Sequence, residues 1–153
     1  MATARTLLAV LLAAGSVTGA WVAEAAAPTK RARYAGKTRQ DLPVSFRVSR
    51  SGKKLVRFRV TLEVECSGGD VTSVRQVRFR QATDFIQVNR DDTFSGDTRI
   101  RGDRGDEVRG GRLAVNGRFV SRRRARGSLH ERLRVADGLR CDSGRVRFTV
   151  RRR

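Results

Sequence analysis

Arginine is the residue type in this chain whose number and spacing most clearly point to a chemical role, the binding of anions. Of the 34 lysine and arginine residues 30 are arginine, and with 15 acidic residues the formal net charge is +19. A guanidinium group presents a planar fork of N–H donors that matches the oxygens of phosphate, sulfate and carboxylate groups. Twelve arginines stand at alternate positions of apolar runs or in one dense cluster, and these are the predicted polyanion-binding residues: Arg57, Arg59, Arg78, Arg80, Arg122, Arg123, Arg124, Arg126, Arg132, Arg134, Arg145 and Arg147.

The arginine excess also has a compositional explanation. Arginine, glycine, alanine and valine dominate while lysine and isoleucine are scarce, as in proteins of GC-rich genomes. That bias explains arginine in place of lysine, but it does not explain more than two basic residues for each acidic one. A surface of this charge attracts polyanions. Like charges side by side on a sheet repel each other, so some arginines are expected to pair with Glu63, Glu65 or Glu131. The alternative is a structural domain, or one that binds a protein or a small ligand, in which the charge is incidental.

Residues for catalysis are few. The only histidine, His130, falls on the outward side of a strand whose Leu133 faces inward, so it is expected at the surface and not beside a nucleophile. A glycosidase needs only two carboxylates, and Asp91, Asp92 and Asp97 lie around one turn. In so basic a chain these are expected to be salt-bridged or solvated. The sequence therefore predicts a non-catalytic domain with no cofactor and no metal site, and a carboxylate-based glycan hydrolase is the less favoured alternative.

The aromatic content limits the kinds of polyanion that fit. There are seven phenylalanines and one tyrosine, most at inward positions, so no platform for stacking single-stranded bases is expected. No helical pattern is present that could enter a major groove. We therefore predict no sequence-specific binding of nucleic acid. The expected partners are anionic polymers of the cell envelope or other extracellular polyanions.

The N-terminal residues have the pattern of a cleavable signal peptide. Arg5 precedes the apolar run 7–14, and Ala23-Glu24-Ala25 is an A-x-A cleavage site. An uncleaved anchor is the weaker alternative, because the apolar run is shorter than the roughly 20 residues that span a bilayer. The predicted division of the chain is a signal peptide (1–25), a loose N-terminal arm (26–33) and a single domain (34–153). The protein is thus expected to be secreted, either extracellular or associated with the cell wall, and to have no transmembrane segment after cleavage.

The two cysteines are consistent with export. Cys66 and Cys141 are far apart and belong to no C-x-x-C pair. An even number of cysteines in a secreted chain predicts a disulfide.

A period of two in the apolar residues sets the fold class. The longest example has six residues expected to face inward: Val56, Phe58, Val60, Leu62, Val64 and Cys66. The same pattern recurs around Phe46, Leu133 and Phe148, while no apolar period of 3.6 persists. The sequence therefore predicts an all-β antiparallel meander of about eight to ten strands, either a β-sandwich or a flattened β-barrel.

Turn signals separate these runs. Ser51-Gly52 and Asp137-Gly138 predict turns, and Asn116-Gly117, between two apolar runs, predicts a hairpin. Pro43 is expected to begin a strand.

Two motifs resemble a known group of proteins. The stretch 34–40 (Y-A-G-K-T-R-Q) and the stretch 140–146 (R-C-D-S-G-R-V) are similar to the opening and closing motifs of an uncharacterised family of small secreted actinobacterial proteins. The resemblance implies an all-β exported domain and carries over no activity and no functional residue.

Overall fold

The computed structural model describes residues 27–68, 72–78, 86–101, 107–136 and 138–153, and in this part of the chain all regular structure is β-strand. The strands are β1 (Arg33–Thr38), β2 (Pro43–Val48), β3 (Lys54–Cys66), β4 (Thr72–Arg78), β5 (Ile86–Val88), β6 (Thr93–Arg101), β7 (Val108–Ser121), β8 (Arg124–Val135), β9 (Arg140–Asp142) and β10 (Val146–Arg152). All the pairings are antiparallel, as predicted. Pro43 begins β2, also as predicted.

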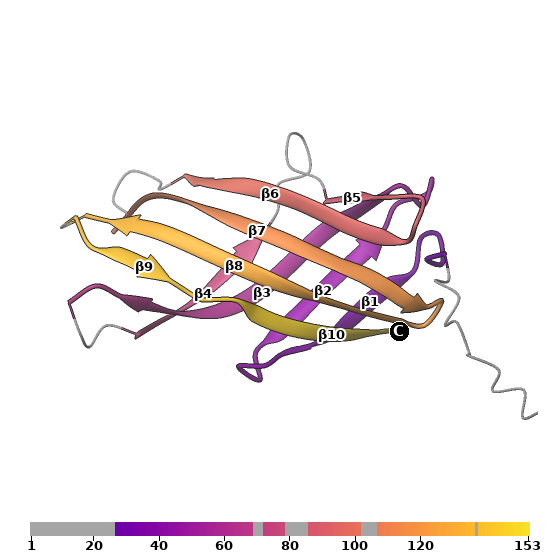
Figure 1. The fold of residues 1–153 in the computed structure, drawn as a ribbon, viewed down its shortest axis with the longest axis horizontal. Coiled ribbons are helices and arrows are strands. Elements are labelled where there is room, and N and C mark those ends of the chain that lie inside the picture. The colour runs from indigo at the N-terminus through magenta and orange to yellow at the C-terminus, as the bar shows by residue number, and fades with distance from the viewer. Residues whose placement is uncertain (1–26, 69–71, 79–85, 102–106, 137) are drawn as a thin grey trace, which may run out of the picture.

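The sheet closes on itself in an irregular ring. The strands β1, β2, β3, β5, β6, β7, β8 and β10 pair in that order, and β10 pairs with β1 to complete the circuit. The junction of β3 with β5 consists of only two residue pairs, while β4 and β9 pair with other parts of β3, so the ring is not a regular barrel. Figure 1 shows two layers, with β6 to β10 in front and β1 to β4 behind.

Aromatic rings fill the space between the layers. Phe46 on β2 lies at the centre, with its ring centroid 5.3 to 6.2 Å from those of Tyr34, Phe58, Phe94 and Phe119. All five side chains are buried. They occupy the space in which a wider ring would hold a small apolar ligand.

A bulge interrupts the period of two in β3. Between the pairs Ser45–Arg59 and Arg47–Val56, β3 advances one residue more than β2 does. Arg57 lies at this point with φ of 53°, a left-handed conformation that is uncommon for arginine. The prediction that Val56 faces inward was wrong, because the extra residue gives the inward position to Leu55 and leaves Val56 only half-buried.

The predicted hairpin turn at Asn116-Gly117 was also wrong. Strand β7 continues through both residues to Ser121, and the chain turns at Arg122 instead. Gly117 instead leaves room for a ring of the core. It pairs with Phe94, and a Cβ on Gly117 would lie 2.3 Å from Cζ of the Phe94 ring and 2.6 Å from the main-chain oxygen of Arg126.

Adding a methyl group at Gly117 is expected to destabilise the protein. We expect Gly117→Ala to lower the free energy of unfolding by about 1–3 kcal/mol, because the Phe94 ring and the backbone of β8 must move. Urea unfolding of purified protein measures the loss. Gly110→Ala on the same strand is the control, since its Cβ would approach no atom closer than 3.5 Å. Equal stability of the two variants would contradict the packing described for Gly117.

Glu131 is placed differently from the expectation. It was predicted to pair with surface arginines, but its side chain is fully buried. It follows the inward parity of Leu129 and Leu133 on β8. Its main chain holds the segment after β9, since Glu131 N donates to Ser143 Oγ (2.9 Å) and Glu131 O accepts from Ser143 N (3.0 Å).

The predicted disulfide between Cys66 and Cys141 is confirmed. The two residues face each other across the β3–β9 pair, with their Cα atoms 3.9 Å apart. The bridge therefore joins the end of β3 to the strand that precedes β10. In the part of the chain that the structure describes, no helix is long and apolar enough to cross a membrane.

Candidate anion-binding site

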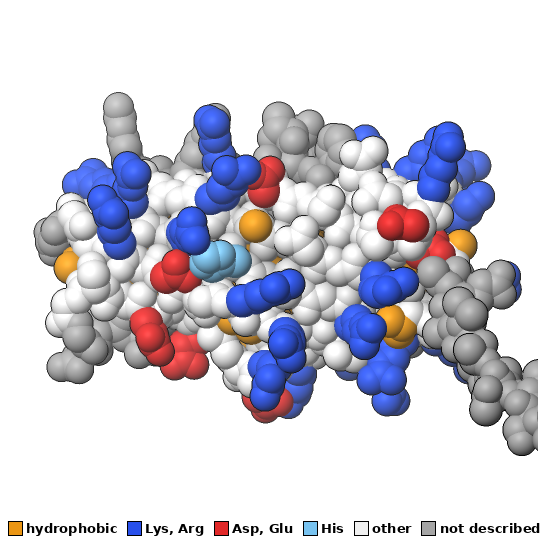
Figure 2. Space-filling model, in the orientation of Figure 1, with side chains coloured by type: hydrophobic (Ala, Val, Ile, Leu, Met, Phe, Trp, Pro, Cys, Tyr) orange, Lys and Arg blue, Asp and Glu red, His pale blue; other side chains and the backbone are white. Residues whose placement is uncertain are grey.

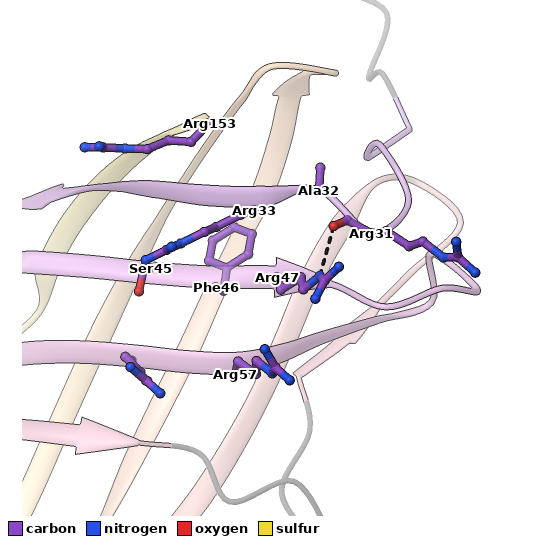
Figure 3. A pocket seen from close by; sticks show the side chains of 9 residues that line it. Arg31, Ala32, Arg33, Ser45, Phe46, Arg47, Arg57 and Arg153 are labelled. Carbon is purple, nitrogen blue, oxygen red and sulfur yellow. Dashed lines mark hydrogen bonds between the residues drawn. The ribbon is translucent and has the colours of Figure 1, made fainter.

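A hollow of about 480 Å³ lies on the outer face of β1, β2 and β3 (Figure 3). We call it the β2 hollow. Six arginines line it: Arg31, Arg33, Arg47, Arg57, Arg59 and Arg153. The hydroxyl-bearing Ser45 also lines it. The hollow is thus a concave surface on which basic side chains of three neighbouring strands converge.

Strand parity and register bring the central arginines together. Tyr34 and Phe46 point into the core, so Arg33 and Arg47 point outward, and these two arginines pair directly across β1 and β2. Arg59 occupies the next strand, opposite Ser45 of β2. The bulge adds Arg57 to the same face, since it leaves the inward positions to Leu55 and Phe58.

The two ends of the described chain complete the hollow. Arg31 N donates to Ser49 O (3.3 Å), and Arg31 O accepts from Arg47 Nε (3.0 Å). Arg153 N donates to Arg33 O (2.9 Å). The last residues of the segment predicted to be a loose arm therefore lie against the sheet, next to the C-terminal residue.

No described Asp or Glu side chain lines the β2 hollow. All six arginines are exposed, and none of them forms an ion pair with a described carboxylate. Like charges this close repel one another, and an anion bound between them relieves that repulsion. The electrostatics of the hollow therefore favour an anionic ligand.

The predicted cluster 122–126 adjoins this hollow. A neighbouring hollow of about 520 Å³ shares Arg31 and Arg153 with it and adds Lys30, Arg123 and Arg152. The β7–β8 turn is held in place by Tyr34, whose hydroxyl donates to the main-chain oxygen of Arg122 (2.7 Å). Basic side chains thus extend without interruption from β3 to this turn.

A second arginine-lined hollow, of about 780 Å³, lies on β7, β8 and β9, and we call it the β8 hollow. It is lined by Arg109, Arg112, Arg132, Arg134 and Arg140, with Asp142. Gly110 and Gly111 of β7 also line it. Figure 2 shows the face formed by β6 to β10, where basic side chains outnumber acidic ones.

Carboxylates form ion pairs with two arginines of the β8 hollow. Arg112 pairs with Asp97, and Arg132 Nε lies 3.4 Å from Asp142 Oδ2. Asp142 Oδ1 lies 2.7 Å from His130 Nε2. Partial burial raises the pKa of Asp142, but hydrogen bonds from Gly144 N and His130, with the charges of His130 and Arg132, outweigh it and lower this pKa below 3.8. Asp142 therefore stays ionised and holds Arg132 in place.

The predicted arginines divide among these surfaces. Arg57 and Arg59 lie in the β2 hollow, Arg123 lies in the adjoining hollow with Arg122 and Arg124 next to it in the chain, and Arg132 and Arg134 lie in the β8 hollow. The remaining described members are exposed but line none of these hollows: Arg126, Arg145 and Arg147. Arg80 and the side chain of Arg78 lie outside the described residues.

Sequence reasoning missed seven of the eleven arginines that line the β2 and β8 hollows. Arg33 and Arg47 flank inward aromatic residues, so parity alone could have found them. Arg31 and Arg153 could not be found in this way, because only the tertiary structure brings the two ends of the domain together. Arg140 pairs with Arg134 across β8 and β9, and Arg109 lies in the register shift of β7 next to Gly110, the residue that pairs with Arg134.

The carboxylates considered for glycan hydrolysis have other roles. Asp91 accepts hydrogen bonds from Thr93 Oγ1 (2.7 Å) and Thr93 N (3.3 Å), which lower its pKa, whereas a general acid needs a raised one. Asp92 is buried in the same turn, and Asp97 pairs with Arg112. In the described chain no group of three His, Cys, Asp or Glu side chains is arranged to hold a metal ion.

Comparison with protein-family models, curated proteins and solved structures finds no match for this chain. The similarity of residues 34–40 and 140–146 to a family of secreted actinobacterial proteins therefore stays a prediction.

Proposed function

We propose that this protein is an exported, non-catalytic β domain that binds anionic polymers of the cell envelope or the extracellular space. The observation that carries the proposal is the β2 hollow, which six arginines line and in which none of them pairs with a described carboxylate. The signal-peptide pattern of residues 1–25 and the disulfide support an extracellular location.

The number of arginines favours polymers that carry phosphate or sulfate groups. A carboxylate is planar, so its two oxygens present their acceptor sites mainly in one plane. The free oxygens of a phosphate or sulfate group belong to a tetrahedron, so that guanidinium forks can approach the group from several directions. Arg33, Arg47 and Arg59 lie on three adjacent strands and line the same hollow, so that an anion bound there would meet forks from different strands.

The test removes arginines from the β2 hollow while the net charge is matched elsewhere. The triple variant Arg33→Gln, Arg47→Gln, Arg59→Gln loses three charges from the hollow. A control variant loses three exposed arginines outside the hollows: Arg50→Gln, Arg99→Gln and Arg118→Gln. The dissociation constants for inorganic polyphosphate, heparin and polyglutamate are measured over a range of salt concentrations.

We expect the hollow variant to bind polyphosphate or heparin about 10- to 100-fold more weakly, since two or more charge-assisted hydrogen bonds are lost. The control variant is expected to change the affinity by less than about threefold, and polyglutamate to bind more weakly than the other two polymers. Equal weakening by both variants would mean that the binding follows from net charge alone. The structural or protein-binding alternative, with incidental charge, would then be the better account.

A further inference from the structure

The β2 hollow and the β8 hollow lie on opposite sides of the molecule. In the closed order of pairing, β2 and β7 are separated by three strands in either direction. Their inward side chains meet in the core, where the ring centroids of Phe46 on β2 and Phe119 on β7 are 6.2 Å apart. The outward side chains of the two strands therefore point away from each other.

The hollows are also displaced along the length of the molecule. The β2 hollow lies near Arg153, at the end where the chain terminates in Figure 1. The β8 hollow includes Arg134 and Arg140, which flank the β8–β9 connection at the other end of the same view. Stacked sheets lie about 10 Å apart, and the arginine side chains add to this distance on both faces. A short anionic segment bound in one hollow cannot reach the other.

The β8 hollow has exposed arginines that can bind an anion. Arg109, Arg134 and Arg140 are exposed, and none of them pairs with a described carboxylate. Arg112 pairs with Asp97, and Arg132 pairs with Asp142. Because part of its charge is neutralised in this way, the β8 hollow is expected to bind an anionic polymer more weakly than the β2 hollow does.

We infer that one copy of this protein binds two anionic polymer chains at once, one in each hollow, and so cross-links them. This inference rests on the proposed function, because it assigns a second binding site of the same chemistry to the opposite face. A domain with two binding sites can link polymer chains, which a domain with a single site cannot do. Once one chain is bound, the second site is held at a high effective concentration near neighbouring chains of the same polymer, which makes bridging efficient.

A two-layer binding experiment tests the inference. Short polyphosphate is immobilised, the exported and oxidised protein is bound to it, and a fluorescent short polyphosphate is then added in solution. The first step measures binding and the second measures bridging. The β8-hollow variant is Arg109→Gln, Arg134→Gln, Arg140→Gln, and the control is again Arg50→Gln, Arg99→Gln, Arg118→Gln, so that both lose three charges. Circular dichroism verifies that each variant is folded.

The wild-type protein and the control variant are expected to recruit the fluorescent polymer. The β8-hollow variant is expected to bind the immobilised polymer within about threefold of the wild type and to lose at least tenfold of the recruitment. Binding without recruitment by the wild type would overturn the inference and leave the proposed function intact, whereas failure to bind the first layer would overturn both. Undiminished recruitment by the β8-hollow variant would also overturn the inference, because bridging would then arise from self-association through other surfaces.

Discussion

Replacing both Cys66 and Cys141 by alanine is expected to lower the free energy of unfolding by about 4 kcal/mol. The bridge spans 75 residues of sequence, and a loop of that length restricts the unfolded chain strongly. This loss is a large part of the stability of a typical small domain. The variant is therefore expected to be the least stable of those described, together with the core variant considered below.

The position of the bridge explains why the sheet cannot replace it. Strand β9 has only three residues and pairs with β3 through two residue pairs, one of which is the cysteine pair itself. Without the bridge, the end of β3 is tied to β9 only by the Glu65–Asp142 pair and by two hydrogen bonds between Ser67 and Arg140 among the described contacts. The effect on the folded state thus adds to the effect on the unfolded chain.

Guanidinium unfolding of the oxidised protein and of the double variant gives the difference directly. The wild-type protein unfolded in the presence of a reductant is the control, and its stability is expected to equal that of the variant. A difference of less than about 1 kcal/mol would show that the unfolded chain is already compact, or that the remaining pairings hold the ring closed.

The class of fold could be predicted because it depends on local patterns. Alternation of apolar and polar residues sets which face of a strand is buried, and this holds through most of β3, β8 and β10. The alternation failed at Val56, where the bulge at Arg57 adds one residue to β3. Nothing in the neighbouring sequence marks a bulge at an arginine, since the left-handed conformation usually calls for glycine.

Gly117 and Glu131 show a second limit. An Asn-Gly pair favours a tight turn, but the same glycine is required where the Phe94 ring lies against the strand. Glu131 was considered only as a partner for arginines, but its parity with Leu129 and Leu133 places it inside, where it is found. For Gly117 the deciding information lies in a contact with a distant part of the chain, whereas for Glu131 it lies in the local alternation of β8.

The sequence predicted outward-facing arginines, but it did not predict which arginines share a hollow. The outward arginines of individual strands follow from parity, yet the order of strands around the ring decides which of them converge. Because β10 returns to pair with β1, Arg153 reaches the hollow that Arg33 and Arg47 begin. The same closure places the β8 hollow on the opposite face.

Phe46 is the core residue whose truncation is expected to have the largest effect. It is almost completely buried and lies against rings from β1, β3, β6 and β7, so that it connects both layers. Phe46→Ala is expected to lower the free energy of unfolding by about 3–5 kcal/mol, because buried apolar area is lost and the surrounding rings cannot fully close the cavity. Phe46→Leu keeps much of the volume and is expected to cost about 1–2 kcal/mol.

Urea unfolding of the two variants tests the packing, and equal losses of stability from Phe46→Ala and Phe46→Leu would contradict a tightly packed aromatic centre.

Polymer binding then tests whether a substitution in the core alters the β2 hollow at the surface. Phe46 forms part of the floor of the β2 hollow but carries no charge. In the absence of denaturant, Phe46→Leu is expected to leave the salt dependence of polyphosphate binding unchanged, since the number of arginine–phosphate contacts sets that slope. A reduced slope in Phe46→Leu would instead mean that the core packing itself holds the arginines of the hollow in position.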